Sequence, residues 1–139
     1  MNRRMACPLV RKIADFLDPT DRNVPKHTYL GFSHAGAMKP LLTLLQLHSD
    51  LPSFDFNLQP GFCDRANDTW NVSLDVSFNS HLVFVLYKDN ASDSFKVLTL
   101  FNQQPVHLKD CDILCPWTQF ERFFDFLAQD CDLGKICNV

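Results

Sequence analysis

The stretch Tyr29-Leu30-Gly31-Phe32-Ser33-His34-Ala35-Gly36-Ala37 decides the fold class of this chain. Its first five residues predict a short strand, in which Gly31 suggests close packing of another backbone. A leucine-rich helix is expected to run from near Gly36 through His48, because Pro40 is tolerated only within the first turn of a helix. A strand that leads into a helix through a tight turn is typical of α/β sheets. The sequence therefore predicts an α/β fold.

Further elements flank this unit on both sides. Asp18-Pro19 ends an amphipathic helix whose apolar residues recur at every fourth position, and the apolar spacing near the end of the chain predicts a last helix. Residues 82–87 and 95–101 predict two paired strands, the first a continuous apolar run of the kind buried on both faces. The apolar residues that define the first helix are Met5, Leu9, Ile13 and Leu17. Those that define the last helix are Phe120, Phe123, Phe124 and Leu127.

This set of elements is too small to form a stable domain by itself. Two or three strands do not make a stable open sheet. We therefore expect residues 1–139 to form part of a larger domain, with an incomplete sheet and flanking helices. Residues 51–69 are rich in turn-forming residues and are interpreted as a long loop.

Charge and hydropathy exclude two classes of function. The net charge is −3 and the isoelectric point is about 5.9, which argues against a nucleic-acid partner, because such proteins carry a clustered basic face. No apolar run is long enough to span a bilayer. The basic residues near the start of the chain are interpreted as the solvated side of the first helix; they are Arg3, Arg4, Arg11 and Lys12.

Cysteines and glycosylation sequons point to the secretory pathway. The chain has 6 cysteines, an even number that favours disulfides. Sequons of the Asn-x-Ser/Thr type begin at Asn67, Asn71 and Asn90, as expected of a lumenal or extracellular protein. The first residues do not form a signal peptide, so we expect that residue 1 is not the natural start of the functional protein.

His34 is the candidate for a chemical role. It lies between the predicted strand and the start of the predicted helix, and ligands of open α/β sheets bind at such strand ends. The free N–H groups and positive dipole end of a helix start favour anions, and the small residues after His34 would let a phosphate approach the backbone. The alternative is a structural histidine that caps the strand or packs on the core.

Several motifs resemble, in chain order, the histidine acid phosphatases, and most closely the inositol polyphosphate phosphatase branch. Residues 32–42 resemble the second catalytic motif of that family, in which a histidine after a core strand precedes an acidic residue and a leucine-rich helix. Residues 80–87 resemble its core strand and residues 100–106 its Leu-Asn-Glu-x-x-Val segment. Cys111-Asp112-Ile113-Leu114-Cys115-Pro116 with Phe120 resembles its Cys-x-x-x-Cys-Pro motif, and residues 5–9 an upstream helix.

The resemblance implies hydrolysis of phosphate monoesters, inositol polyphosphates among them, without a metal or cofactor. A histidine in an Arg-His-Gly motif would form a phosphohistidine, arginines and a second histidine would hold the phosphate, and a carboxylic acid would protonate the leaving oxygen. His34 would be the second, phosphate-binding histidine. This sequence contains no Arg-His-Gly, and Gly36 occupies the position of the acid. The missing N-terminal half of the same domain is therefore an expected partner.

Two alternatives stay open. Cys111, Cys115 and His107, with Cys131 and Cys137, could be drawn as zinc ligands, although two short-loop disulfides fit the sequons and the family better. Cys7 and Cys63 could pair with each other or with cysteines in a missing half of the domain, and the sequence does not choose between these. The chain could also be a non-catalytic secreted pseudophosphatase or anion-binding module, since it lacks both Arg-His-Gly and the acid.

Overall fold

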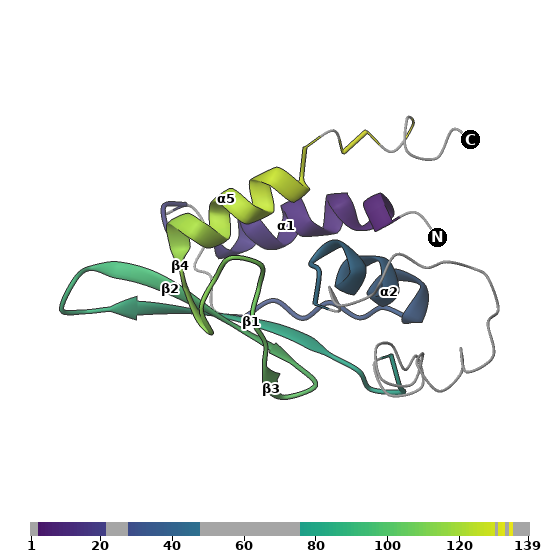
Figure 1. The fold of residues 1–139 in the computed structure, drawn as a ribbon, viewed down its shortest axis with the longest axis horizontal. Helices are drawn as coiled ribbons and strands as arrows, with labels where there is room; N and C mark the ends of the chain where they lie inside the picture. The colour runs from purple at the N-terminus through teal and green to yellow at the C-terminus, as the bar shows by residue number, and fades with distance from the viewer. Residues whose placement is uncertain (1–2, 22–27, 48–75, 130, 133, 135–139) are drawn as a thin grey trace.

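One layer of helices covers one antiparallel sheet in the computed structural model, which describes residues 3–21, 28–47, 76–129, 131–132 and 134 (Figure 1). The architecture is mixed α/β. The helical elements are η1 (Arg3–Ala6), α1 (Cys7–Leu17), α2 (Ala35–Leu44) and α5 (Trp117–Leu127). The strands are β1 (Leu82–Asp89), β2 (Ser94–Phe101), β3 (Gln104–Pro105) and β4 (Leu114–Pro116). No helix of the described residues is long and apolar enough to cross a membrane.

The sheet is built around β2. Strand β1 pairs antiparallel with β2 along its full length, from Leu82 opposite Phe101 to Asp89 opposite Ser94. The two short strands β3 and β4 both pair with the other edge of β2. Among the described residues β1 is therefore an edge strand, whereas the sequence predicted burial on both faces for residues 82–87.

The two faces of the sheet differ in what covers them. Because side chains alternate along a strand, Phe84 of β1 and Val97 of β2 face the helices, and Val97 is fully buried. Val83 and Tyr87 face the opposite side, where they are 38% and 47% exposed. Figure 1 shows α1 and α5 side by side over one face, with no described helix over the other. The names inner face and outer face are used below for these two sides.

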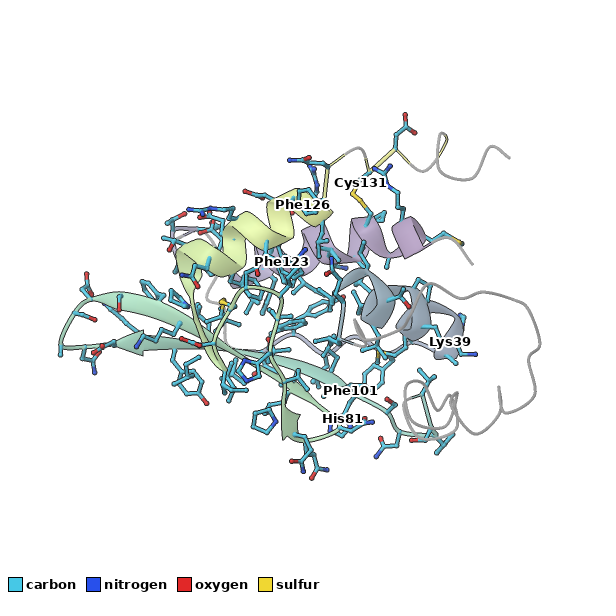
Figure 2. The ribbon with its side chains drawn as sticks, in the orientation of Figure 1. Lys39, His81, Phe101, Phe123, Phe126 and Cys131 are labelled. Carbon is cyan, nitrogen blue, oxygen red and sulfur yellow. A yellow bond between two sulfur atoms is a disulfide. The ribbon has the colours of Figure 1, made fainter. Side chains whose placement is uncertain are left out.

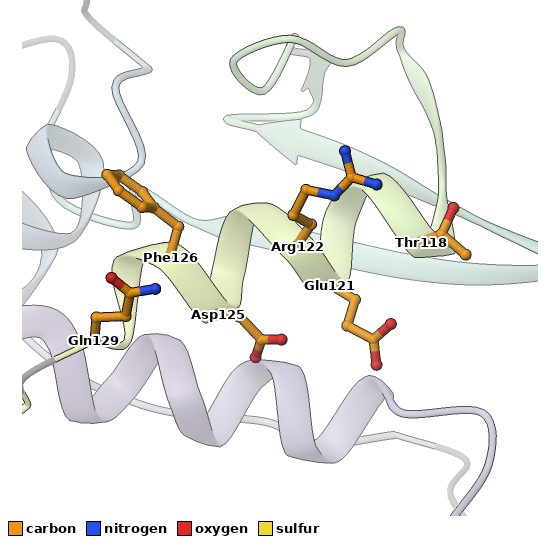
Figure 3. Close-up of a pocket in the computed structure, with 6 residues that line it drawn as sticks. All are labelled: Thr118, Glu121, Arg122, Asp125, Phe126 and Gln129. Atoms are coloured by element: carbon orange, nitrogen blue, oxygen red, sulfur yellow. The ribbon is translucent and has the colours of Figure 1, made fainter.

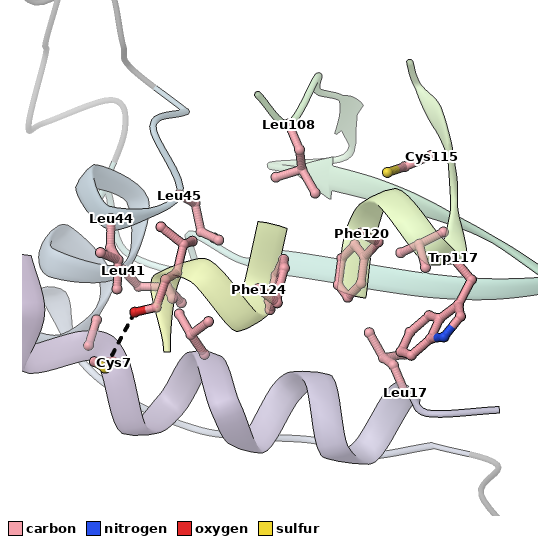
Figure 4. Close-up of a cluster of buried hydrophobic side chains, with 14 residues drawn as sticks. Cys7, Leu17, Leu41, Leu44, Leu45, Leu108, Cys115, Trp117, Phe120 and Phe124 are labelled. Carbon is pink, nitrogen blue, oxygen red and sulfur yellow. Dashed lines mark hydrogen bonds between the residues drawn. The ribbon is translucent and has the colours of Figure 1, made fainter. Parts of the chain in front are cut away.

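Aromatic rings of α5 form the centre of the core (Figure 4). Phe120 and Phe124 are fully buried and stack on each other with ring centroids 4.0 Å apart. Phe84 from the inner face meets both rings edge-on, at 5.9 and 5.7 Å. Such offset and edge-on pairs add about 0.5–1.5 kcal/mol each beyond the burial of their apolar area. The predicted i, i+3, i+4, i+7 spacing thus places these rings against the sheet.

A cluster of contacts ties α1 to the end of α5. Arg4 donates to the carbonyl oxygen of Gln129 at 2.9 Å, and Arg11 donates to that of Ala128 at 3.2 Å. Cationic side chains at these carbonyls satisfy acceptors that a helix end leaves free and favour the helix dipole. A disulfide joins Cys7 to Cys131, 124 residues away (Cys131 is labelled in Figure 2). The interpretation of these two arginines as merely solvated was therefore incomplete.

The segment before α2 differs from its prediction. The predicted strand over 29–33 is not formed, because no described strand lies beside it to share hydrogen bonds. Leu30 and Phe32 are 73% and 93% exposed. Helix α2 begins at Ala35, close to the expected start near Gly36, but Pro40 lies beyond its first turn, where proline has no N–H for the carbonyl of Gly36.

Several predictions lie outside the described residues. These are the loop over 51–69 and the roles assigned to Cys63, Cys137, Asn67 and Asn71. Asn90 is described, and it is exposed in the turn between β1 and β2. In that turn, hydrogen bonds from the Ser92 hydroxyl and the Ala91 N–H lower the pKa of the Asp89 carboxyl from its ordinary value.

Candidate functional site

His34 is the N-cap of α2. Its backbone is extended, with φ −137° and ψ 172°, and its carbonyl oxygen accepts the N–H groups of Ala37 at 2.9 Å and Met38 at 3.1 Å. Its ring folds back over the helix, and Nδ1 accepts the N–H of Gly36 at 3.0 Å. The side chain thus satisfies one of the donors that a helix start leaves free.

The cap determines which ring nitrogen carries the proton. A backbone N–H can only donate, so Nδ1 must offer a lone pair, and the proton of the neutral imidazole lies on Nε2. His34 is exposed, so Nε2–H is a donor at the surface beside the helix start. The Ala35 N–H, which has no partner in the described part of the chain, is a second free donor there.

Gly36 permits this arrangement of the ring. A Cβ at position 36 would lie 2.6 Å from Cε1 and 2.8 Å from Nδ1 of His34, closer than such atoms approach. Any side chain at position 36 would push the imidazole off the cap. Gly36 thus occupies the position of the expected acid and also leaves room for the His34 ring to cap its own helix.

The described residues do not assemble a complete catalytic set around His34. They contain no group of three or more histidine, cysteine or carboxylate side chains that could hold a metal. The carboxylate next downstream in sequence, Asp50, lies outside them. Two N–H donors of this kind are suited to hydrogen-bond an oxygen of an anion, whereas neither is a carboxylic acid that could protonate a leaving group.

The zinc alternative conflicts with the cysteine pairing. Cys111 and Cys115 are joined to each other in a disulfide, so their sulfurs are not free thiolates, the form in which cysteine binds zinc. The His107 ring contacts the carbonyl oxygen of Cys111 at 3.2 Å. Cys131 is bonded to Cys7, which corrects the expected short loop from Cys131 to Cys137. A pairing between positions so far apart in sequence leaves no signal in local spacing.

Residues 100–106, which resemble the Leu-Asn-Glu-x-x-Val segment of the family, have a structural role in this chain. Asn102 and Gln103 form the turn between β2 and β3 with φ 47° and 69°. The side-chain oxygen of Asn102 accepts the Ser80 hydroxyl and the His81 N–H, both at 3.0 Å. Asn102 therefore anchors the chain where it enters β1. The His81 ring contacts the carbonyl oxygen of Asn79 at 3.0 Å, and nothing places it near the start of α2.

A shallow hollow lies on the exposed side of α5 (Figure 3). Its lining comes from that helix and from Gln129, two residues past the helix end, and it mixes one cation with two carboxylates. A surface of this kind is typical of a solvated helix face. The lining residues are Thr118, Glu121, Arg122, Asp125, Phe126 and Gln129.

Comparison with known proteins finds a distant relative but no family match. No protein-family model matches the chain. Over 121 residues the chain is 27% identical to multiple inositol polyphosphate phosphatase 1 of Dictyostelium discoideum, an alignment that covers 86% of this chain and 19% of that protein. The chain thus spans about one fifth of the length of this curated relative. The match supports a distant relationship to histidine acid phosphatase-like proteins.

Proposed function

We propose that this chain is a portion of a histidine acid phosphatase domain that acts on phosphate monoesters, with inositol polyphosphates as the substrate class. The observation that carries the proposal is His34, which directs an Nε2–H donor to the surface at the start of α2. The ordered resemblance of the motifs and the distant inositol polyphosphate phosphatase relative support it. The disulfides fit a secretory-pathway location for the whole protein.

The role of His34 in this proposal is to bind a phosphate oxygen. Nε2–H is exposed beside the start of α2, where the Ala35 N–H lies and where the helix dipole favours negative charge. Hydrogen bonds to an ionised oxygen are about twice as strong as neutral ones. The nucleophile and the arginines would come from polypeptide beyond the motifs present here, so the reaction belongs to the complete domain.

A second candidate function follows from Gly36. The ring of His34 folds onto its own helix where the family places an acid, which favours an anion-binding domain without turnover. In this alternative, phosphate is held at the start of α2 and never hydrolysed.

Phosphate titration tests the role of His34. We expect inorganic phosphate and inositol hexakisphosphate to shift the NMR signals of the Ala35 and Gly36 amides and of the His34 ring. In His34→Asn the cap is kept, because asparagine is a good N-cap, but the Nε2 donor is lost and affinity is expected to fall by about tenfold. His107→Asn is the matched control and should bind as the parent chain does. Titration curves that His34→Asn leaves unchanged would rule out the assigned role.

Phosphate release separates the two candidate functions. The native protein, captured with an antibody to this segment, should release phosphate from inositol hexakisphosphate between acidic and neutral pH if the phosphatase proposal holds, whereas the 139-residue chain alone should not. Binding by the chain without release by the native protein would instead support the anion-binding alternative.

A further inference from the structure

The turn that joins β1 to β2 contains the Asn-x-Ser sequon that begins at Asn90. Strand pairing ends at Asp89 opposite Ser94, so residues 90–93 form the turn. Asn90 is exposed. In Figure 1 this end of the hairpin projects beyond α1 and α5. The sequon therefore lies at the free end of the hairpin, away from the helices.

Hydrogen bonds and an ion pair explain the other polar residues of this turn. The Asp89 carboxylate accepts the Ala91 N–H at 2.9 Å and the Ser92 hydroxyl at 2.8 Å. Lys88 pairs with Asp93, with Nζ and Oδ1 2.6 Å apart, and Asp93 has the positive φ of the turn, 51°. Each of these side chains thus helps to form the turn.

Asn90 has no such part in the turn. Its side chain makes no hydrogen bond, ion pair or ring contact with the residues that the structure describes, and its φ is not positive. Asparagine is favoured in turns because its side chain bonds nearby backbone and because it tolerates positive φ. Asn79 has a φ of 71°, and Asn102 combines a φ of 47° with two hydrogen bonds. Neither reason applies at position 90.

The charge of the turn favours its exposure in the complete domain as well. Residues 88–94 hold one lysine, two aspartates and no large apolar side chain. The side chains of the Lys88–Asp93 pair are 50% and 83% exposed. Polypeptide laid over them would remove their hydration, which is costly for charged groups. We therefore expect the turn to stay accessible whatever completes the sheet.

We propose that Asn90 carries an N-linked oligosaccharide in the native protein. The oligosaccharide comes from a lipid-linked oligosaccharide diphosphate. The side-chain nitrogen of Asn90 attacks the anomeric carbon of this donor, the new C–N bond replaces the C–O bond to the diphosphate, and the lipid diphosphate leaves. One amide proton passes to a base of the transferase. The inference rests on the secretory-pathway location proposed above and not on phosphatase activity.

The Ser92 hydroxyl indicates when the transfer takes place. This hydroxyl is part of the sequon that the transferase recognises. In the folded turn it donates to Asp89 and lies 2.7 Å from the Ser94 hydroxyl oxygen. The transfer therefore takes place before the turn closes. An oligosaccharide already on Asn90 then disturbs no described contact of the folded turn.

Peptide mapping of the native protein, captured with an antibody to this segment, tests the proposal. Trypsin cleaves after Lys88 and Lys96 and releases residues 89–96, in which Asn90 is the one asparagine. A peptide N-glycosidase in water labelled with heavy oxygen converts a glycosylated asparagine to labelled aspartate. We expect the label at Asn90, and an unlabelled peptide 89–96 would overturn the proposal.

Two measurements on the same protein separate this inference from the location on which it rests. The tryptic peptide that begins at Ala66 contains the sequons of Asn67 and Asn71, and a non-reducing map shows whether Cys7 is bonded to Cys131. Either signal without label at Asn90 would show a secretory-pathway protein whose turn is not modified. Absence of both, with Asn90 unlabelled, would overturn the location together with the modification.

Substitutions in the complete protein, expressed in eukaryotic cells, test the assignment to this sequon. Asn90→Gln and Ser92→Ala should each remove one oligosaccharide, seen as one step in electrophoretic mobility. Ser94→Ala is the matched control, because it loses the contact with Ser92 but keeps the sequon, and it should migrate as the parent does. Mobility that Asn90→Gln leaves unchanged would overturn the proposal.

Discussion

Thr99 places a hydroxyl in the apolar layer between the inner face and α5. Its side chain is 2% exposed, and Oγ1 has no hydrogen-bond partner among the residues that the structure describes. A buried hydroxyl without a partner loses its hydration and gains nothing in return. The threonine is tolerated there because its β-branched shape fits a strand.

Thr99→Val should raise the free energy of unfolding by about 1 kcal/mol, because valine keeps the shape and removes the unpaired oxygen. Urea denaturation monitored by circular dichroism measures the change. Thr43→Val is the control, since the Thr43 hydroxyl donates to the Lys39 carbonyl oxygen at 2.8 Å and its loss should give no gain. A Thr99→Val protein less stable than the parent would show that Oγ1 has a partner in solution.

His34 has a structural role as the cap of α2 that mutation can separate from the proposed binding. His34→Ala removes the side-chain cap of α2 and should lower the free energy of unfolding by about 1 kcal/mol. His34→Asn should retain most of that stability, because its oxygen can accept the same N–H. Equal loss in both variants, measured by thermal melts at neutral pH, would contradict the capping geometry.

At the scale of elements, the turn between β2 and β3 carries backbone strain. Asn102 and Gln103 both have positive φ, as in the type I′ turns that favour asparagine followed by glycine. Asparagine tolerates this conformation, whereas glutamine is disfavoured in it.

Gln103→Gly should therefore stabilise the protein by about 0.5–1 kcal/mol, the strain relieved less the entropy that glycine adds to the unfolded chain. Chemical denaturation quantifies the effect. Gln104→Gly, in β3 next to the turn, adds the same entropy without relieving strain and should destabilise. If both glycines destabilise, the turn does not have this conformation in solution.

The spacing of apolar residues correctly predicted the helices and strands whose own sequence shows a helical or strand-like pattern. The apolar spacing of Phe120, Phe124 and Leu127 predicted α5, and the two apolar runs predicted the hairpin of β1 and β2. The strand over 29–33 was wrong, because a strand also needs a neighbour that its own sequence does not encode. The edge position of β1 was missed for the same reason.

The candidate site was predictable only in outline. The sequence placed His34 at a helix start, since a small-residue turn precedes a leucine-rich run. The sequence did not predict that the His34 ring would accept the Gly36 N–H. This contact depends on the space that is free because Gly36 has no side chain. The Cys7–Cys131 pairing likewise depends on the docking of α1 on α5.

At the scale of the whole molecule, the two disulfides should contribute unequally. In the chain-entropy description the stabilisation grows with loop length, to about 5 kcal/mol for a loop as long as that between Cys7 and Cys131 and about 2 kcal/mol for the one between Cys111 and Cys115. Cys7→Ser/Cys131→Ser should therefore lower the melting temperature more than Cys111→Ser/Cys115→Ser. Equal losses would show that local strain or packing, and not loop closure, sets the contribution.

The contact between the first helix and the last has a consequence for synthesis on the ribosome. The partner of Cys7 is made 124 residues later, which takes about 6–25 s at ordinary elongation rates of about 5–20 residues per second. During that interval the apolar side of α1 has emerged while α5 has not yet been made. In an oxidising compartment Cys7 can bond in that interval to a cysteine that is made before Cys131, and the native pair then forms only by thiol–disulfide exchange. A stall before residue 131 leaves the Cys7 thiol without its native partner.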